Sequence, residues 1–129
     1  KKLDPSSVEN IYMLKTGKLL QASILGPTYF RALDEEKVLA LKNFSESIGV
    51  AFQIQDDLIE AVGDADMIGK SIESDKSKNK AAYPLLFGVS ESKKRVENLY
   101  ESACDSLKVF GESSSSLMDM AEIIIQRKL

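Results

Sequence analysis

The residues best suited to chemistry are three carboxylates, Asp56, Asp57 and Glu60, within the otherwise apolar run 49–62. The run has the pattern of a helix, in which successive residues advance by about 100°. Asp56 and Glu60 therefore share one face, with Gln53 and Asp57 flanking them. Magnesium prefers a few carboxylates together with retained waters and substrate phosphates. The acidic stripe is thus better suited to Mg²⁺-bridged diphosphate than to zinc or iron.

A bound diphosphate also needs cations, and lysines on other segments could supply them: Lys15, Lys70 and Lys80. Such cations would neutralise the charge that develops on a leaving diphosphate. The tripeptide Gly69-Lys70-Ser71 looks like the end of a P-loop. The earlier glycine of that motif would fall at Asp64, and no strand precedes it, so the P-loop is rejected.

A simpler interpretation of these residues involves no chemistry. An acidic pair on a helix is usually a solvated face, and Lys15 and Lys18 would then be ordinary surface lysines. On that interpretation Asp56→Ala and Asp57→Ala change nothing but surface charge. The pattern alone does not decide whether the polar stripe faces solvent or an internal cavity.

Composition narrows the class of protein. The chain has 129 residues, 43% hydrophobic and 29% charged, which suits one soluble domain with a real core. A net charge of −3 argues against a nucleic-acid partner, and the absence of histidine removes the usual zinc ligand. The single cysteine, Cys104, excludes an internal disulfide and suits a reducing cytosol. No apolar run is long enough to span a membrane, so a cytoplasmic location without membrane insertion is expected.

Two long helices are expected to position the acids and the first lysine. Asp4-Pro5-Ser6-Ser7 starts the first helix, with Ser6 and Glu9 spaced as a capping box, and Gly26-Pro27 ends or kinks it. Its mid-helix Gly17 costs about 1 kcal/mol relative to alanine, which suggests a packing or access reason. Asp34 is expected to cap a second helix over 35–62.

The rest of the chain is expected to be helical as well. Gly63 to Asp66 should close the second helix, and 63–80 is the longest non-periodic stretch. A short apolar segment over 81–89 precedes a helix capped by Ser90 and ended by Gly111. The serines 113–116 form a linker before a last helix, which Ser116 and Asp119 open with capping-box spacing. The architecture is therefore expected to be an all-α helical bundle.

Several short motifs together resemble the trans-isoprenyl diphosphate synthases. Lys15-Thr16-Gly17 matches their upstream lysine–threonine motif, and residues 124–127 resemble their C-terminal ending. Their second aspartate-rich region is matched, in order, by residues 52–60, Gly63-Asp64, Gly69-Lys70, Asp75, Asn79-Lys80 and Tyr83-Pro84. The resemblance covers nearly the whole chain and is greatest to bacterial farnesyl and geranylgeranyl diphosphate synthases, of the polyprenyl synthetase family.

This resemblance implies a fold and a reaction. Residues 1–129 would be the C-terminal portion of one class I terpenoid (isoprenoid) synthase domain. Such enzymes are prenyltransferases that condense isopentenyl diphosphate with an allylic diphosphate, with Mg²⁺, by ionisation, condensation and elimination. The family is typically homodimeric.

The resemblance also implies roles for particular residues. Asp56 and Asp57 would hold Mg²⁺ on the allylic diphosphate, and Glu60 occupies the third acidic position, directly or through water. The family usually has aspartate there; glutamate keeps the charge on a side chain one methylene longer.

Lys15 and Lys70 would contact the allylic diphosphate, with Lys80 nearby. Thr16 and Gln53, together with Lys15, would line the reacting centre. Diphosphate itself would be the proton acceptor, which is compatible with a chain that lacks histidine.

The family's first aspartate-rich motif, its following arginines and its upstream isopentenyl-binding residues have no counterpart here. The chain is therefore expected to be part of a longer synthase and to be inactive by itself. The alternative is a non-catalytic helical subunit that regulates a catalytic partner. Such subunits tend to lose their acids, whereas Asp56, Asp57, Lys15 and Lys70 are all present, which favours the enzyme.

Overall fold

The computed structural model describes residues 3–67 and 82–126, and of residues 62–67 only the backbone. Within these ranges the chain forms helices and no strand, so the all-α prediction is confirmed. The elements in chain order are α1 (Pro5–Tyr12), the π-helix η1 (Met13–Gly17), α2 (Lys18–Leu25), the 3-10 helix η2 (Gly26–Phe30), α3 (Glu35–Met67), α4 (Tyr83–Phe87), α5 (Val89–Ser106), the 3-10 helix η4 (Leu107–Ser114) and α6 (Ser115–Gln126).

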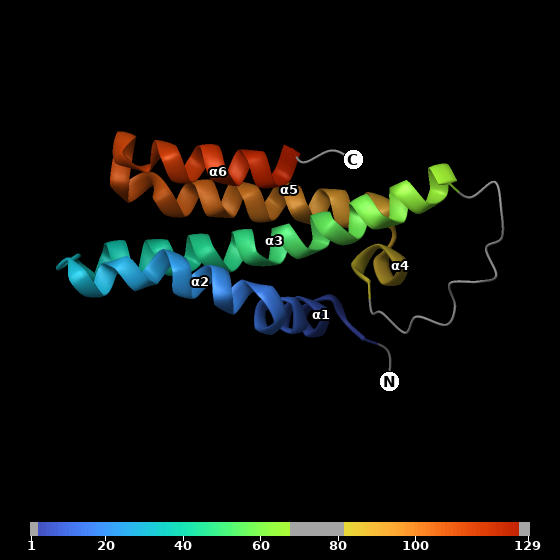
Figure 1. Cartoon of the computed structure of the whole chain (residues 1–129), viewed down its shortest axis with the longest axis horizontal. Coiled ribbons are helices and arrows are strands. Elements are labelled where there is room, and N and C mark those ends of the chain that lie inside the picture. The colour runs from blue at the N-terminus through green and yellow to red at the C-terminus, as the bar shows by residue number, and fades with distance from the viewer. Residues whose placement is uncertain (1–2, 68–81, 127–129) are drawn as a thin grey trace.

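The long helix α3 lies in the middle of the bundle. The continuous segment α1–η1–α2 runs along one side of α3, and α5 and α6 run along the other (Figure 1). Helix α3 is apolar over a wide arc, so it can be buried against both neighbours at once. Phe44, Ile48 and Ile54 are fully buried on it. The core around α3 falls into two clusters, one centred on Val50, Ile54 and Leu58 and the other on Phe44 and Ile48.

The first segment begins as expected but is capped differently. Asp4 is the N-cap of α1, and its Oδ1 accepts a hydrogen bond from the Ser7 backbone N at 2.9 Å. The expected capping box of Ser6 and Glu9 is wrong, because the Glu9 carboxylate is paired with Arg95 of α5 instead. The expected ending at Gly26-Pro27 is confirmed as a change from α-helix to the 3-10 turn η2.

Helix α3 begins at Glu35, directly after Asp34, as predicted, but it continues to Met67 rather than closing at Gly63. A single glycine costs a helix only about 1 kcal/mol, whereas extending a formed helix adds one hydrogen bond for each residue fixed. A glycine without a proline or a capping side chain after it is thus a weak stop signal.

Two glycines with positive φ shape the C-terminal half. Gly88, at φ 91°, separates α4 from α5, so α5 starts at Val89 and the predicted Ser90 cap is wrong. Gly111, at φ 55° and ψ −137°, kinks the chain inside η4 rather than ending α5, which stops at Ser106. The predicted serine linker, which follows this kink, is itself helical, because Ser114 lies in η4 and Ser115 starts α6. Among the described helices, none is long and apolar enough to cross a membrane.

Candidate functional site

A line of polar contacts joins α1–η1–α2 to α3. The Tyr12 phenol donates to Asp57 Oδ2, Thr16 Oγ1 donates to Gln53 Oε1 at 3.0 Å, and Gln21 Nε2 donates to Glu46 Oε1 at 3.1 Å. Residue numbers rise along one partner and fall along the other, so the two segments are antiparallel. We call these six residues the polar seam: Tyr12, Thr16, Gln21, Glu46, Gln53 and Asp57. The acidic stripe of α3 therefore turns its Gln53–Asp57 side toward α1 and η1.

Two glycines bring the helices of the seam close together. A Cβ placed on Gly49 would lie 2.7 Å from Gly17 Cα, a separation that real Cβ atoms do not tolerate. A Cβ placed on Gly17 would overlap the Met13 Sδ atom. Both glycines are buried. The packing reason expected for Gly17 is thus its close crossing with Gly49, one turn from the Thr16–Gln53 hydrogen bond.

The lysine–threonine motif lies on a π-helix. Residues 13–17 form η1, which adds an extra residue to the helical turn and so changes the direction of the side chains it carries. Thr16 is half-buried against α3, whereas Lys15 is exposed. Short π-helical turns within α-helices are frequent at functional sites. Thr16 therefore faces the seam, whereas Lys15 faces outward.

Asp57 accepts hydrogen bonds from three different elements. Its Oδ2 accepts from the Tyr12 phenol of α1 and from the Tyr83 backbone N of α4 at 3.2 Å. Its Oδ1 faces Gln53 Nε2 at the longer distance of 3.5 Å. Gln53 thus bridges Thr16 and Asp57 through the two ends of its carboxamide. Burial, followed by the hydrogen bond to Asp57, raises the pKa of Tyr12 above its ordinary value, so the phenol keeps its proton.

The three predicted metal ligands share α3 but have different surroundings. Asp56 and Asp57 are half-buried and Glu60 is exposed. Among the described residues, no three acidic, histidine or cysteine side chains lie close enough together to hold a metal ion. The donor chemistry nevertheless fits magnesium, which is commonly held by one or two carboxylates plus waters and substrate phosphates. Lys70 and Lys80, the other predicted diphosphate ligands, lie outside the described residues.

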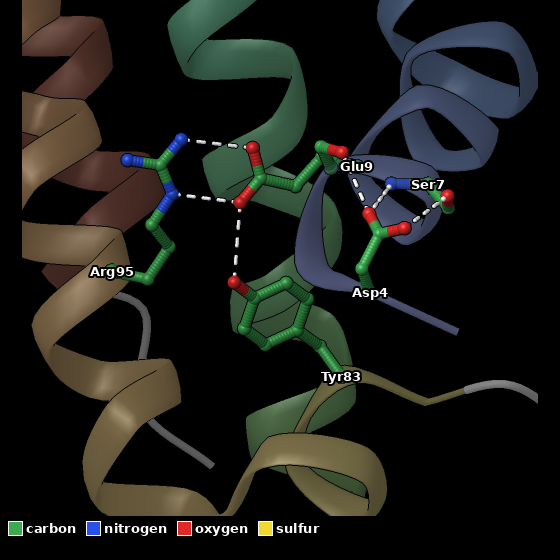
Figure 2. Close-up of polar contacts among 6 residues, drawn as sticks. Asp4, Ser7, Glu9, Tyr83 and Arg95 are labelled. Atoms are coloured by element: carbon green, nitrogen blue, oxygen red, sulfur yellow. Dashed lines mark hydrogen bonds and ion pairs between the residues drawn. The ribbon is translucent and has the colours of Figure 1, made fainter. Parts of the chain in front are cut away.

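A second cluster of polar contacts surrounds the carboxylate of Glu9, one turn before the seam on α1. Arg95 of α5 donates to both oxygens of Glu9, from Nε at 2.7 Å and from Nη2 at 2.8 Å, and the Tyr83 phenol donates to Glu9 Oε1 at 3.1 Å (Figure 2). We call Glu9, Tyr83 and Arg95 the arginine cluster. Burial and the charge of Glu9 raise the pKa of Tyr83 to about 12, and the bond to Glu9 raises the pKa of Arg95.

The two clusters are connected through Tyr83. Its backbone N donates to the Tyr12 phenol at 2.8 Å as well as to Asp57, while its side chain reaches Glu9. The sequence pattern singles out neither Tyr12 nor Arg95, and it points to Glu9 and Tyr83 for other reasons than this contact. For Tyr12 a signal existed, because it lies four residues before Thr16 and hence on the same helical face. Arg95 gave no comparable signal, since it is 86 residues from Glu9.

Comparison with known proteins assigns the family. Residues 1–113 match the family model of the polyprenyl synthetases. The chain belongs to the polyprenyl synthetase family. Over 125 residues it is 37% identical to the farnesyl diphosphate synthase of Escherichia coli K12, an alignment that covers 94% of this chain and 42% of the relative. It is 35% identical to the farnesyl diphosphate synthase of Haemophilus influenzae, with 99% of this chain and 44% of the relative covered.

Solved structures share this fold. A candidate farnesyl-diphosphate synthase from Marinomonas sp. MED121 superposes with a TM-score of 0.77 at 31% identity, covering 98% of this chain and 42% of the other. A geranyltransferase from Legionella pneumophila has the same TM-score at 23% identity, with 98% and 39% covered. This member of the polyprenyl synthetase family therefore has the all-α terpenoid synthase fold. It spans less than half the length of the relatives that it matches.

Proposed function

We propose that this chain is the C-terminal portion of a short-chain trans-isoprenyl diphosphate synthase, of farnesyl or geranylgeranyl type. The complete protein would transfer a prenyl group from an allylic diphosphate to isopentenyl diphosphate. The observation that best supports this is the hydrogen-bonded contact between the lysine–threonine π-helix and the Gln53–Asp57 side of the acidic stripe. Two motifs that are 37 residues apart in the chain meet at this contact.

The proposed reaction breaks one bond and makes another. The allylic C–O bond breaks, and diphosphate leaves with both electrons of that bond. The double bond of isopentenyl diphosphate then attacks the allylic carbon, which forms the new C–C bond. A proton is lost from the condensed product to the departing diphosphate, and this restores a double bond.

The described residues would contribute binding and orientation. Lys15, on the exposed side of the π-helix, would bind the allylic diphosphate together with Lys70 and Lys80. The hydrogen bond from Thr16 holds the Gln53 carboxamide in one orientation, so its dipole would be fixed beside the reacting carbon. Neither Thr16 nor Gln53 can take up a proton near neutral pH, which suits diphosphate as the acceptor.

Asp56 and Asp57 would hold Mg²⁺ on the diphosphate, with Glu60 directly or through water. When bound, the ion would neutralise charge on the leaving group. Asp57 is suited to this role because, within the described part of the chain, its hydrogen-bond donors are neutral and leave its negative charge uncompensated.

The test uses calorimetric titration of Mg²⁺ with diphosphate present, and a prenyl-transfer assay that follows diphosphate release. The complete protein, obtained by extending the coding sequence upstream, should bind Mg²⁺ with diphosphate and form prenyl product. Asp56→Ala and Asp57→Ala should both abolish that binding, whereas Glu97→Ala, on an exposed face of α5, should not. The 129-residue chain alone should form no product. Prenyl transfer by the chain alone, or full activity in Asp57→Ala, would contradict the proposal.

The complete protein is also proposed to be a homodimer. Sedimentation velocity on the complete protein would measure its mass directly, and a monomer at assay concentrations would exclude this part of the proposal.

A further inference from the structure

We propose that Tyr12 is a positioning residue for Asp57: its phenol, together with the Tyr83 backbone N–H, fixes the carboxylate so that Oδ1 is the oxygen presented to a cation. This inference depends on the proposed function, because it assumes that Asp57 serves the Mg²⁺–diphosphate complex. Neither Tyr12 nor the amide of Tyr83 would itself contact substrate.

The two carboxylate oxygens of Asp57 have different hydrogen-bond partners. Oδ2 accepts from both the Tyr12 phenol and the Tyr83 amide, and each carboxylate oxygen has about two lone-pair sites. The acceptor capacity of Oδ2 is therefore filled. Oδ1 faces only the long 3.5 Å contact with Gln53 among the described residues. It is the oxygen with capacity left for a cation.

The donors cannot easily move away from Asp57. Tyr12 is 5% exposed, and its ring lies 6.4 Å from the ring of Tyr83, centroid to centroid. Tyr83 is 4% exposed and packs on Phe87 at 4.7 Å, while its phenol is held by Glu9 and through it by Arg95. A chain of packed and hydrogen-bonded groups thus runs from α5 to Asp57. Partners that orient a metal-binding carboxylate in this way commonly affect metal affinity or activity 10- to 100-fold.

The competing interpretation is that the Tyr12 hydroxyl only ties α1 to α3. The chain offers a second buried phenol that separates these interpretations. Tyr83→Phe removes the hydroxyl bonded to Glu9 but leaves the Tyr83 backbone N–H on Asp57. Both variants remove one buried hydroxyl, so a purely structural role predicts parallel effects. Tyr29→Phe makes the same chemical change on a side chain that is 88% exposed and is the matched control.

The experiment compares Tyr12→Phe, Tyr83→Phe, Tyr29→Phe and Asp57→Asn in the complete protein. Measured are Mg²⁺ affinity with diphosphate by calorimetry, kcat and KM for prenyl transfer, and the thermal unfolding midpoint. We expect Tyr12→Phe to weaken Mg²⁺ affinity about 10-fold or more and to lower kcat more than it raises KM for the allylic diphosphate. Tyr83→Phe keeps the Tyr83 backbone N–H on Asp57, so it should lower the unfolding midpoint and weaken Mg²⁺ affinity far less than Tyr12→Phe does. Tyr29→Phe should change neither.

Equal Mg²⁺ affinity in Tyr12→Phe and Tyr83→Phe would overturn the inference while leaving the proposed function intact, provided that Asp57→Asn loses binding. Unchanged binding in Asp57→Asn would instead refute the proposed role of Asp57, and the inference with it. If Tyr12→Phe does not fold, the wild-type protein still provides a test by NMR. The Tyr83 amide resonance should shift on addition of Mg²⁺ with diphosphate, relative to diphosphate alone, and an unchanged resonance would overturn the inference.

Discussion

The arginine cluster and the Asp57 end of the polar seam meet α1 one helical turn apart, at Glu9 and Tyr12. The carboxylates in these two places have opposite electrostatic surroundings. Glu9 is paired with the guanidinium of Arg95 through two short bonds and also accepts from Tyr83. Asp57 accepts from a phenol, a backbone N–H and a carboxamide, all neutral, in the part of the chain that the structure describes. Glu9 is charge-compensated, whereas Asp57 is oriented without being compensated.

The difference indicates which carboxylate can serve a cation. A bidentate arginine satisfies both oxygens and the charge of its partner, which suits a fixed link between helices. Neutral donors stabilise the ionised carboxylate and fix its orientation, but they do not neutralise its negative charge. Glu9 therefore holds α1, α4 and α5 together, and Asp57 has the electrostatics of a ligand. The two are joined by Tyr83, so the structural cluster supports the one proposed to be functional.

The largest expected effect comes from separating the helices of the seam while leaving the arginine cluster alone. Gly49→Ala places a Cβ 2.7 Å from Gly17 Cα, and because that atom is backbone, the two helices must move apart. We expect a loss of about 2–3 kcal/mol in the free energy of unfolding, typical of overpacking. Chemical denaturation measures it. Gly26→Ala is the control, because a Cβ there meets no atom within 4 Å. A loss of less than about 0.5 kcal/mol in Gly49→Ala would show that the crossing is not tight.

Breaking the arginine cluster should reduce the free energy of unfolding by a smaller amount. Arg95→Ala leaves the Glu9 carboxylate, whose side chain is 17% exposed, with the Tyr83 phenol as its remaining described donor. Because Arg95 itself is 39% exposed, we expect a loss of about 1.5 kcal/mol in the free energy of unfolding. The control is Lys108→Ala, which removes a lysine 75% exposed in its pair with Asp105 and should leave the unfolding midpoint unchanged. Equal effects of the two substitutions would mean that the bidentate pair is no stronger than a surface one.

Only part of the difference between Glu9 and Asp57 could be predicted from the sequence. The spacing of Asp56, Asp57 and Glu60 within an apolar run identified the acidic stripe, because helical periodicity is a local property. The motif around Thr16 was likewise visible in the chain. Glu9 was misassigned to a capping box for the same reason: local spacing was satisfied, and the competing partner lies 86 residues away. Which carboxylate is compensated depends on tertiary packing, and the sequence pattern does not contain it.

The helix boundaries also show what local sequence signals can and cannot predict. The predicted starts at Pro5 and directly after Asp34 are confirmed, since the signals at the start of a helix act within its first turn. Gly63 and Gly111 were predicted to end helices, and neither does. Glycine permits a positive φ but does not require one, so its effect depends on what the following residues pack against. Gly88 and Gly111, at φ 91° and 55°, adopt it within the described chain.

Neutralising Asp57, the carboxylate at one end of the seam, should reduce the free energy of unfolding still less. Asp57→Asn keeps a carbonyl oxygen for the Tyr12 phenol and the Tyr83 amide, while its new amide group faces Gln53. We expect a loss of about 1 kcal/mol, the net value of one imperfect hydrogen bond. Arg95→Ala should therefore destabilise the chain more than Asp57→Asn does, although only Asp57→Asn should abolish Mg²⁺ binding. The reverse order of unfolding free energies would show that Asp57 is the main structural link.

A further effect depends on pH and involves Tyr83, the residue that joins the two clusters. The Tyr83 phenol has an ordinary pKa of 10.0, which burial and Glu9 raise to about 12 in the folded chain. The folded state therefore retains a proton that the unfolded state releases first. This contribution to stability is complete below pH 10 and is lost as the pH rises through 12.

The test compares the free energies of unfolding of wild type and Tyr83→Phe as a function of pH. The pKa of Tyr12 is also raised, but both proteins contain Tyr12, so the difference between them isolates Tyr83. The gap between their unfolding free energies should narrow across that interval and stay constant below it. A constant gap throughout would mean that the phenol is not buried beside Glu9, and Tyr83 would then link the arginine cluster to Asp57 by its backbone alone.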